Sequence, residues 1–349
     1  MKVAVYAIAK NEEQHVARWA ESCKEADYRL ILDTGSTDST IDRAYECGVE
    51  VFSASINPWR FDDARNTSLA LLPDDIDFCI ALDMDEVLVP GWREALEKVS
   101  PDTTRPRYQY TWSWTDDNQP GLQYGGDKIH KRHGYRWKHP VHETLTTDRI
   151  QEAQEWIGLE IHHHPDESKS RGQYFPLLEL AVAEDPTDDR NQYYLAREYF
   201  FHGMLDKAAD MFKRHLQNPK ATWGPERAAS CRYLAKCLPD LAHLYLEQAI
   251  NEAPGRREAL VEMAQYHYTK QDWANCLETV LQAIYIEEKP LDYLCEEFAW
   301  GGLPYDLAAI SAYNLGDKET AYRYGGIALG FNPEDDRLAR NMEFYRGED

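Results

Sequence analysis

Residues 77–88 read DFCIALDMDEVL, an apolar run that passes directly into a group of carboxylates. A short apolar run of this kind is typical of a buried β-strand. Side chains alternate along extended backbone, so Asp83 and Asp85 are expected to face one cavity together. Two carboxylates this close repel each other unless a proton or a cation neutralises them. A hard divalent ion, Mg²⁺ or Mn²⁺, suits such a site, and an acidic turn at a strand end is the alternative.

The residues before this run alternate between strand and helix patterns. Strands are expected at 3–9, 29–36 and 49–54, and helices at 12–26, 36–48 and 61–73. This alternation predicts an α/β domain with a mostly parallel, Rossmann-like sheet and helices on both faces. Ligands bind such sheets at the carboxyl ends of the strands. Asp33 ends the second strand, so we expect it to share one crevice with the Asp83–Glu86 cluster.

From about residue 175 the pattern is wholly helical, and it repeats every 34 residues. Small and bulky residues recur at this spacing in four sets: Ala208, Ala242 and Cys276; Ala196, Ser230 and Ala264; Tyr199, Tyr233 and His267; Phe212, Leu246 and Val280. A fourth unit, containing Ala321 and Ala328, fits after an insertion of 11 residues. The period is that of the tetratricopeptide repeat, with a generic helical bundle as the alternative. We therefore expect domains at 1–172 and 173–349.

The composition disfavours several classes of protein. The formal net charge of −23 repels nucleic acid and anionic membranes without excluding either. Apolar runs are only a few residues long, whereas a membrane-spanning helix needs about 20. The N-terminal apolar run meets charge at once, so we expect a first strand and not a signal peptide. Seven cysteines without framework spacing indicate reduced thiols, and these features together predict a cytoplasmic protein.

Four segments of the first domain form an ordered set. They are AIAKNEE (7–13), LDTGSTDST (32–40), DARNTSL (63–69) and ALDMDE (81–86). In this order they resemble the family 2 glycosyltransferases of the GT-A fold. The resemblance implies a nucleotide-sugar donor bound by Asn11, Glu12, Asp33, Arg65 and Asp83. It also implies that Asp83 and Asp85 bind a Mn²⁺ or Mg²⁺ ion. A turn aspartate is the alternative for Asp33, and a surface helix arginine is the alternative for Arg65.

A second block reads KIHKRHGYRWKHPVHETL (128–145) and IHHHPDESKSRGQYFPLLELA (161–181). It resembles a subgroup of the same family that carries helical repeats. This resemblance marks His142 and Glu143 as site residues, with His142 a metal ligand, and implies one further metal ligand among the residues 162–164. Since alternate strand positions face one way, we favour His162 or His164. A solvated polar loop is the alternative for the three histidines.

Basic residues gather in the same block, at Lys128, Lys131, Arg132, Arg136 and Lys138. The diphosphate of a sugar nucleotide is their simplest partner, and Lys131 and Arg132 are its expected contacts. A solvated loop is the alternative for this basic segment.

Transfer with inversion also needs a base near the acceptor hydroxyl. The usual family 2 base is an aspartate in a later ED-type motif, and no clean ED motif follows the cluster here. Glu143 is the first candidate, and Asp116 or Asp117 is the second. In a structural alternative, Glu143 pairs with Arg132 or Arg136.

The leading functional hypothesis is a metal-dependent, inverting glycosyltransferase that uses a nucleotide sugar, with UDP-sugars favoured. The repeats suggest a protein or peptide acceptor, and a saccharide is equally compatible. Transfer to a modified base in DNA is disfavoured by the acidic charge. A nucleotidyltransferase would open with a glycine-rich basic loop, which AIAKNEE is not. A tetratricopeptide scaffold with an inactive first domain is a further alternative, against which the Asp83/Asp85 pair argues. The repeats could also mediate a homodimer.

Overall fold

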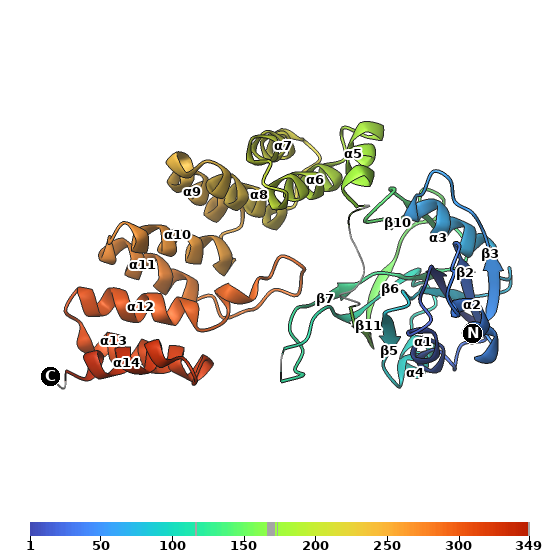
Figure 1. Cartoon of the computed structure of the whole chain (residues 1–349), viewed down its shortest axis with the longest axis horizontal. Coiled ribbons are helices and arrows are strands. Elements are labelled where there is room, and N and C mark those ends of the chain that lie inside the picture. The colour runs from blue at the N-terminus through green and yellow to red at the C-terminus, as the bar shows by residue number, and fades with distance from the viewer. Residues whose placement is uncertain (116, 166–171, 173, 348–349) are drawn as a thin grey trace. The chain divides into compact units, whose positions relative to one another are not determined.

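The computed structural model describes residues 1–115, 117–165, 172 and 174–347. Its contacts divide the chain into two compact units, Met1–Ala181 and Val182–Asp349. The first unit is α/β and the second is helical (Figure 1), which confirms the fold class expected from the sequence. The division falls within α5 (Tyr174–Glu184), a little beyond the expected boundary at residue 172.

A five-stranded sheet in the order β3-β2-β1-β4-β8 forms the base of the first unit. The strands are β3 (Glu50–Ser53), β2 (Tyr28–Asp33), β1 (Val3–Ala9), β4 (Phe78–Ala81) and β8 (Ile129–Lys131). The first four run parallel, and β8 pairs antiparallel with β4. The carboxyl ends of β1, β2 and β4 therefore meet at one edge of the sheet, where α/β proteins bind ligands.

Helices cover both faces of this sheet. The side chains of β1 point alternately to the two faces, and those on each face pack into a separate apolar core. Val5 belongs to the core that includes Trp19 of α1, whereas Tyr6 belongs to the core that includes Leu69 of α3. The helices of this unit before α5 are α1 (Val16–Ser22), α2 (Thr40–Glu46), α3 (Phe61–Ala70) and α4 (Trp92–Glu97). The residues of β4 are all buried, as is usual in a parallel sheet covered on both faces.

The apolar run at 77–88 does not form a single strand. After β4 a turn carries Leu82 to Asp85, and β5 (Glu86–Leu88) then joins a second sheet in the order β5-β11-β6-β7. The remaining strands are β6 (Arg105–Thr111), β7 (Gln123–Gly126) and β11 (Gln154–His163), together with a hairpin of β9 (Arg136–Lys138) and β10 (Thr144–Thr146). The carboxylate cluster therefore lies in a turn between two sheets, so strand alternation does not orient Asp83 and Asp85.

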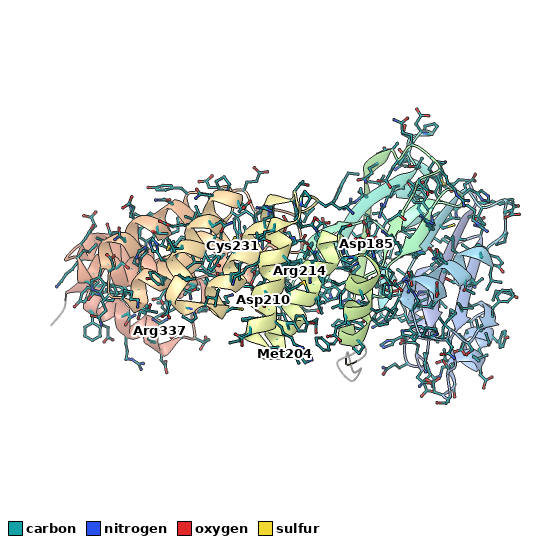
Figure 2. All side chains as sticks on the ribbon, turned by 90° about the horizontal axis from the view of Figure 1, so that it is seen from above. Asp185, Met204, Asp210, Arg214, Cys231 and Arg337 are labelled. Atoms are coloured by element: carbon teal, nitrogen blue, oxygen red, sulfur yellow. The ribbon has the colours of Figure 1, made fainter. Side chains whose placement is uncertain are left out.

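The second unit is a run of helices that pack on their neighbours in sequence, as in tetratricopeptide arrays. They are α6 (Asp189–Phe201), α7 (Leu205–Gln217), α8 (Gly224–Cys237), α9 (Ala242–Glu252), α10 (Arg257–Thr269), α11 (Trp273–Ile284), α12 (Leu303–Asn314), α13 (Lys318–Phe331) and α14 (Asp336–Arg346), with short 3₁₀ turns at Pro239–Leu241 and Glu297–Ala299. The expected crossing residues Ala208, Ala264 and Cys276 are fully buried. Figure 2 shows side chains filling the space between these helices, and the buried Cys231 of α8 is one of them.

Residues 285–302 separate α11 from α12, at the insertion that the repeat spacing predicts. The segment folds back on α8, where the Tyr293 hydroxyl donates to Glu226 Oε1 at 2.5 Å. Further along, Glu296 Oε1 accepts from Arg232 Nη1 at 2.6 Å. The insertion is thus fixed by polar contacts to the repeat array. Within the residues that the structure describes, no helix is long and apolar enough to span a membrane.

Candidate functional site

Backbone contacts hold the turn after β4 in one conformation. Trp19 Nε1 donates to the carbonyl just before Asp83 at 3.0 Å. The Asp83 amide donates to Glu86 Oε2 at 2.8 Å, and the Glu86 amide donates to the Asp83 carbonyl at 2.9 Å. On the other side, the His164 amide donates to the Asp85 carbonyl at 2.8 Å. These contacts tie the backbone of the turn to α1 on one side and to β5 and the end of β11 on the other.

Asp83 lies between two basic side chains. Its Oδ1 accepts from Arg65 Nη2 and its Oδ2 accepts from Lys128 Nζ, both at 2.6 Å. Lys128 also donates to Glu86 Oε1 at 2.9 Å, and Arg65 pairs through Nε with Glu143. Burial alone would raise the pKa of Asp83, but Arg65 and Lys128 outweigh it and hold that pKa well below its usual range. Asp83 is therefore an ionised carboxylate with both oxygens engaged.

Glu86 and Lys128 also belong to this cluster. The sequence places Glu86 in the carboxylate run and Lys128 in the basic segment expected near the diphosphate, but it does not predict their contacts with each other and with Asp83. Glu86 is 1% exposed and also accepts from the Tyr110 hydroxyl at 2.6 Å. Burial raises the pKa of Glu86, even though Lys128 opposes that effect. Lys128 reaches both carboxylates because β8 pairs with β4. Two signals pointed to these residues: Glu86 continues the carboxylate run, and Lys128 begins the basic segment.

Asp85 faces His163. The distance from His163 Nε2 to Asp85 Oδ2 is 3.4 Å, and His163 Nδ1 lies 2.9 Å from the Trp112 carbonyl oxygen. The imidazole also stacks on the Trp112 ring, with 4.3 Å between centroids. Burial would lower the pKa of His163, but Asp85 and the Trp112 carbonyl outweigh burial and raise it. The structure thus fixes the orientation of His163 toward Asp85.

The neighbouring histidines have other contacts. His162 Nε2 lies 3.3 Å from Glu160 Oε2, and the His164 ring stacks on Trp114 with 5.8 Å between centroids. Burial lowers the pKa of His164. Strand alternation favours His162 or His164 as the further metal ligand, whereas the structure turns the middle histidine, His163, toward Asp85. The reason is register, because β11 pairs with β5 so that position 163 lies opposite Glu86.

The loops after β1 and β2 bring Asn11, Glu12 and Asp33 together at the same edge of the sheet. Asp33 is 2% exposed, and its carboxylate accepts from two backbone amides of the following turn at 3.0 and 3.1 Å. Asn11 Oδ1 accepts from the Thr37 amide at 2.8 Å, and the Glu12 amide donates to Thr40 Oγ1 at 2.7 Å. The contacts of Asp33 are those of a turn aspartate, which is the alternative that the sequence allows for this residue.

Lys131 and Arg132 lie at the amino end of β4, whereas Asp83 follows its carboxyl end. The Lys131 ammonium is 4.4 Å from the centroid of the Phe78 ring. Arg132 donates to the Leu72 carbonyl at 2.8 Å and to the next carbonyl at 3.1 Å. The structure therefore does not bring these two expected diphosphate contacts into the cluster, and Lys128 is the member of the basic segment that enters it.

The three base candidates lie in different surroundings. Glu143 joins the cluster, where it pairs with Arg65. The two arginines expected as its partners in the structural alternative, at positions 132 and 136, pair with Asp74 and Asp148 instead. Asp117 is exposed in the loop between β6 and β7, and Asp116 lies outside the described residues. The ring of His142 packs edge-on against Tyr174, with 5.8 Å between centroids.

Charge and geometry in this cluster suit a divalent cation. Arg65 and Lys128 pair with three carboxylates, at positions 83, 86 and 143. Asp85 follows in the same turn and faces His163, so negative charge is in excess when all four carboxylates are ionised. Asp85 and His163 offer a carboxylate oxygen and an imidazole nitrogen 3.4 Å apart, a separation that one ion can bridge. Asp83 offers no oxygen without a basic partner in this arrangement. The pair that fits a metal is therefore Asp85 with His163.

No family model and no curated protein matches the sequence. Solved structures resemble parts of it. PilF of Pseudomonas aeruginosa matches 50% of this chain and 72% of its own at 14% identity and a TM-score of 0.38. MamA matches 47% and 89% at 14% identity and a TM-score of 0.37.

A third similar structure is the glucosyl-3-phosphoglycerate synthase of Mycobacterium tuberculosis, solved with Mn²⁺, UDP and glucosyl-3-phosphoglycerate. It matches 31% of this chain at 24% identity and a TM-score of 0.27, and the match spans 44% of the synthase. The PilF and MamA likenesses cover the C-terminal half of the chain, and the synthase likeness covers a smaller part. At these identities they concern the fold alone.

Proposed function

We propose that this protein is a metal-dependent, inverting glycosyltransferase that moves a sugar from a nucleotide sugar, with UDP-sugars favoured, to a protein, peptide or saccharide acceptor. The observation that carries the proposal is the turn between β4 and β5. There the Asp85–His163 pair stands beside a carboxylate held by the buried Arg65 and the half-buried Lys128. An α/β sheet edge with this charge arrangement suits a diphosphate and its metal ion.

The charge excess of the cluster explains why a metal is needed. A nucleotide diphosphate adds negative charge to a cluster in which ionised carboxylates already outnumber the basic side chains. A Mn²⁺ or Mg²⁺ ion held by Asp85 and His163 would neutralise the diphosphate and stabilise the charge that develops on the leaving group. The imidazole orientation is fixed in advance by the Trp112 carbonyl, which is the usual way to hold a metal-binding histidine.

Arg65 and Lys128 have two tasks in this proposal. They hold Asp83 ionised in the absence of ligand, and they supply donors beside the position of the diphosphate. Arg65 Nη1 is buried and, among the described residues, has no hydrogen-bond partner. A buried N–H without a partner is costly, so a phosphate oxygen that reached it would gain a charge-assisted hydrogen bond.

Glu143 is the proposed base. It lies in the cluster, and its side chain is 11% exposed, so a hydroxyl could be shielded there from bulk water. Glu143 is paired with Arg65, and the proposal therefore requires that Arg65 shifts toward the donor when the donor binds, so that the carboxylate becomes available to the acceptor hydroxyl. The Glu143→Gln variant tests this role, since it should keep donor binding and lose transfer.

A donor panel tests the function directly. The full chain is mixed with UDP-, GDP- and dTDP-sugars, with and without Mn²⁺, and both the melting temperature and the release of nucleoside diphosphate are measured. We expect one donor class to raise the melting temperature only when Mn²⁺ is present, because a ligand that binds the native state stabilises it. We also expect slow hydrolysis of the same donor.

The matched control is a carboxylate outside the cluster. Asp42 is exposed on α2, so Asp42→Asn should behave as the wild type, whereas Asp85→Asn should lose the Mn²⁺-dependent response. Absence of binding and hydrolysis across the whole panel would refute the proposed function. An equal response in both variants would refute the assignment of Asp85.

A further inference from the structure

A second group of titratable side chains lies in the helical unit, separate from the cluster in the first unit. It comprises Asp189 at the start of α6, His215 near the end of α7 and Glu226 in the first turn of α8. Each residue offers one ligand atom, and these atoms all lie within 4.8 Å of one another. Three consecutive helices of the repeat array therefore direct two carboxylates and an imidazole to one point.

The imidazole in this group is buried and incompletely satisfied. His215 is 0% exposed, and its Nδ1 lies 2.9 Å from the Ser230 hydroxyl oxygen. Within the described part of the chain, its Nε2 has no hydrogen-bond partner. Buried polar atoms in native proteins are almost always paired, so a buried nitrogen without a partner requires an explanation.

The position of Glu226 sharpens this point. Its Oε2 is 3.6 Å from His215 Nε2, which is beyond the usual range of a hydrogen bond. The Tyr293 hydroxyl donates to the other oxygen, Oε1, and so leaves Oε2 directed at the imidazole. A tetrahedral ion with ligands at about 2.0–2.2 Å has neighbouring ligand atoms roughly 3.4 Å apart, close to the observed separation.

We propose that Asp189, His215 and Glu226 bind a Zn²⁺ ion. One imidazole and two carboxylates form a ligand set that zinc accepts, and a hydrogen bond from Nδ1 to Ser230 would direct the Nε2 lone pair at the ion. Asp189 is half-buried, so the ion would enter from its side, and its carboxylate oxygen lies within 4.8 Å of the other two ligand atoms. The site links α6, α7 and α8, and its role is to stabilise the beginning of the repeat array.

The simpler explanation accounts for only part of the group. Acidic residues in the first turn of a helix are stabilised by the helix dipole, which explains Asp189 and Glu226 separately. It does not explain why a fully buried imidazole directs an unpartnered nitrogen at one of them. A proton on Nε2 would pair it with Glu226, and the experiment below separates that arrangement from a bound metal.

The test is the zinc content of the full chain after equilibrium dialysis against buffered Zn²⁺, measured by mass spectrometry of the metal. The wild type and the Asp85→Asn, His215→Gln and Asp189→Asn variants are compared. We expect Asp85→Asn to keep the zinc of the helical unit. We expect His215→Gln to lose one equivalent, and Asp189→Asn to bind it at least about tenfold more weakly. The two metal sites are thereby distinguished, and the result does not depend on any transferase activity.

His243 supplies the matched control. On α9 it stands 3.7 Å from Glu247, so it forms a histidine–carboxylate pair of the same separation, but both side chains are exposed. His243→Gln should leave the zinc content unchanged. Far-UV circular dichroism confirms folding, and if His215→Gln does not fold, Asp189→Asn decides. Wild-type zinc content and affinity in a folded His215→Gln or in Asp189→Asn would overturn the proposal in favour of a protonated ion pair.

Discussion

Two of the histidine–carboxylate pairs in the molecule belong to the proposed metal sites, and they have similar geometry in different surroundings. In the first unit His163 lies 3.4 Å from Asp85, and in the second unit His215 lies 3.6 Å from Glu226. The Asp85 side chain is 24% exposed, whereas the Glu226 side chain is 6% exposed. The first pair is therefore open to solvent at Asp85, whereas the second is shielded and is reached from the side of the half-buried Asp189.

This difference in access indicates a difference in task. A catalytic metal needs exchangeable positions that a substrate can reach, whereas a metal that only stabilises the fold needs none; at the buried site a water would complete the three protein ligands proposed for zinc. The way each imidazole is held agrees with this division. His163 is oriented by the backbone carbonyl of Trp112, and His215 is oriented by the Ser230 side chain on a neighbouring helix. We therefore expect loss of the first pair to affect chemistry and loss of the second to affect stability.

The largest loss of stability is expected from removing a basic side chain that pairs with the carboxylates of the first unit. Lys128→Met would remove the cation that pairs with the buried Glu86 carboxylate and would leave Asp83 with Arg65 alone. Because removing one partner of a fully buried ion pair costs about 3–5 kcal/mol and Lys128 is half-buried, we expect a loss of about 2–3 kcal/mol. Urea unfolding monitored by tryptophan fluorescence measures the change. Lys138→Met on β9 is the control, because Lys138 is exposed and its loss should change stability by less than about 0.5 kcal/mol. Equal changes in both would show that the Lys128 contacts are not stabilising.

The second prediction is that removing a carboxylate from each pair has opposite effects on hydrolysis and on stability. Asp85→Asn should reduce donor hydrolysis about 10²–10³-fold with little change in melting temperature. The reason is that the variant weakens binding of the metal ion that would stabilise the negative charge on the leaving nucleoside diphosphate. Glu226→Gln should lower the melting temperature in the presence of Zn²⁺ and leave hydrolysis unchanged. The rates come from nucleoside diphosphate release under saturating Mn²⁺. If Asp85→Asn unfolds the protein while Glu226→Gln abolishes hydrolysis, the comparison between the pairs is wrong.

The third prediction concerns removal of the metal. A ligand present at 100 times its dissociation constant stabilises the native state by about 2.7 kcal/mol, so a zinc chelator should lower the melting temperature of the wild type. Asp85→Asn should show the same decrease, since it keeps the helical site. His215→Gln should melt at the same temperature with and without chelator, measured by differential scanning calorimetry. A wild type indifferent to the chelator would contradict this expectation.

The smallest effect is expected from the group that orients His215. Ser230→Ala removes the partner of Nδ1, and loss of such a partner weakens metal binding about tenfold, or about 1.4 kcal/mol. Competition with a fluorescent zinc indicator measures this change. Ser311→Ala is a control on α12, where another fully buried serine lies away from the three ligands. Equal affinities in the two variants would contradict the orienting role of Ser230.

Much of the fold could be predicted because its signals are local. Strand and helix periods are visible within ten or so residues, and the small residues at helix crossings recur at one spacing. The carboxylate cluster was visible for the same reason, since Asp83, Asp85 and Glu86 are neighbours in sequence. The break between β4 and β5 could not be predicted, because an apolar strand that changes sheets has the same residue pattern as one that continues.

The contacts of the site could be predicted less well because they depend on long-range pairing. Lys128 reaches Asp83 across 45 residues, and only the pairing of β8 with β4 brings them together. Which of the three histidines at 162–164 faces Asp85 depends on the register of β11, and a run of identical residues contains no alternation from which to read it. His215, Asp189 and Glu226 belong to three helices and form no motif in the sequence.

The insertion at 285–302 has a consequence for any partner of the repeat array. Asp292 binds Arg256 at 2.5 Å and Glu296 binds Arg232, so acidic side chains from the same chain already neutralise two arginines near α8 and α10. An acidic segment from another molecule would have to compete with this tethered one. Because a short tether keeps its end at a local concentration of about millimolar, we expect an acidic partner of the array to need additional contacts to displace this segment.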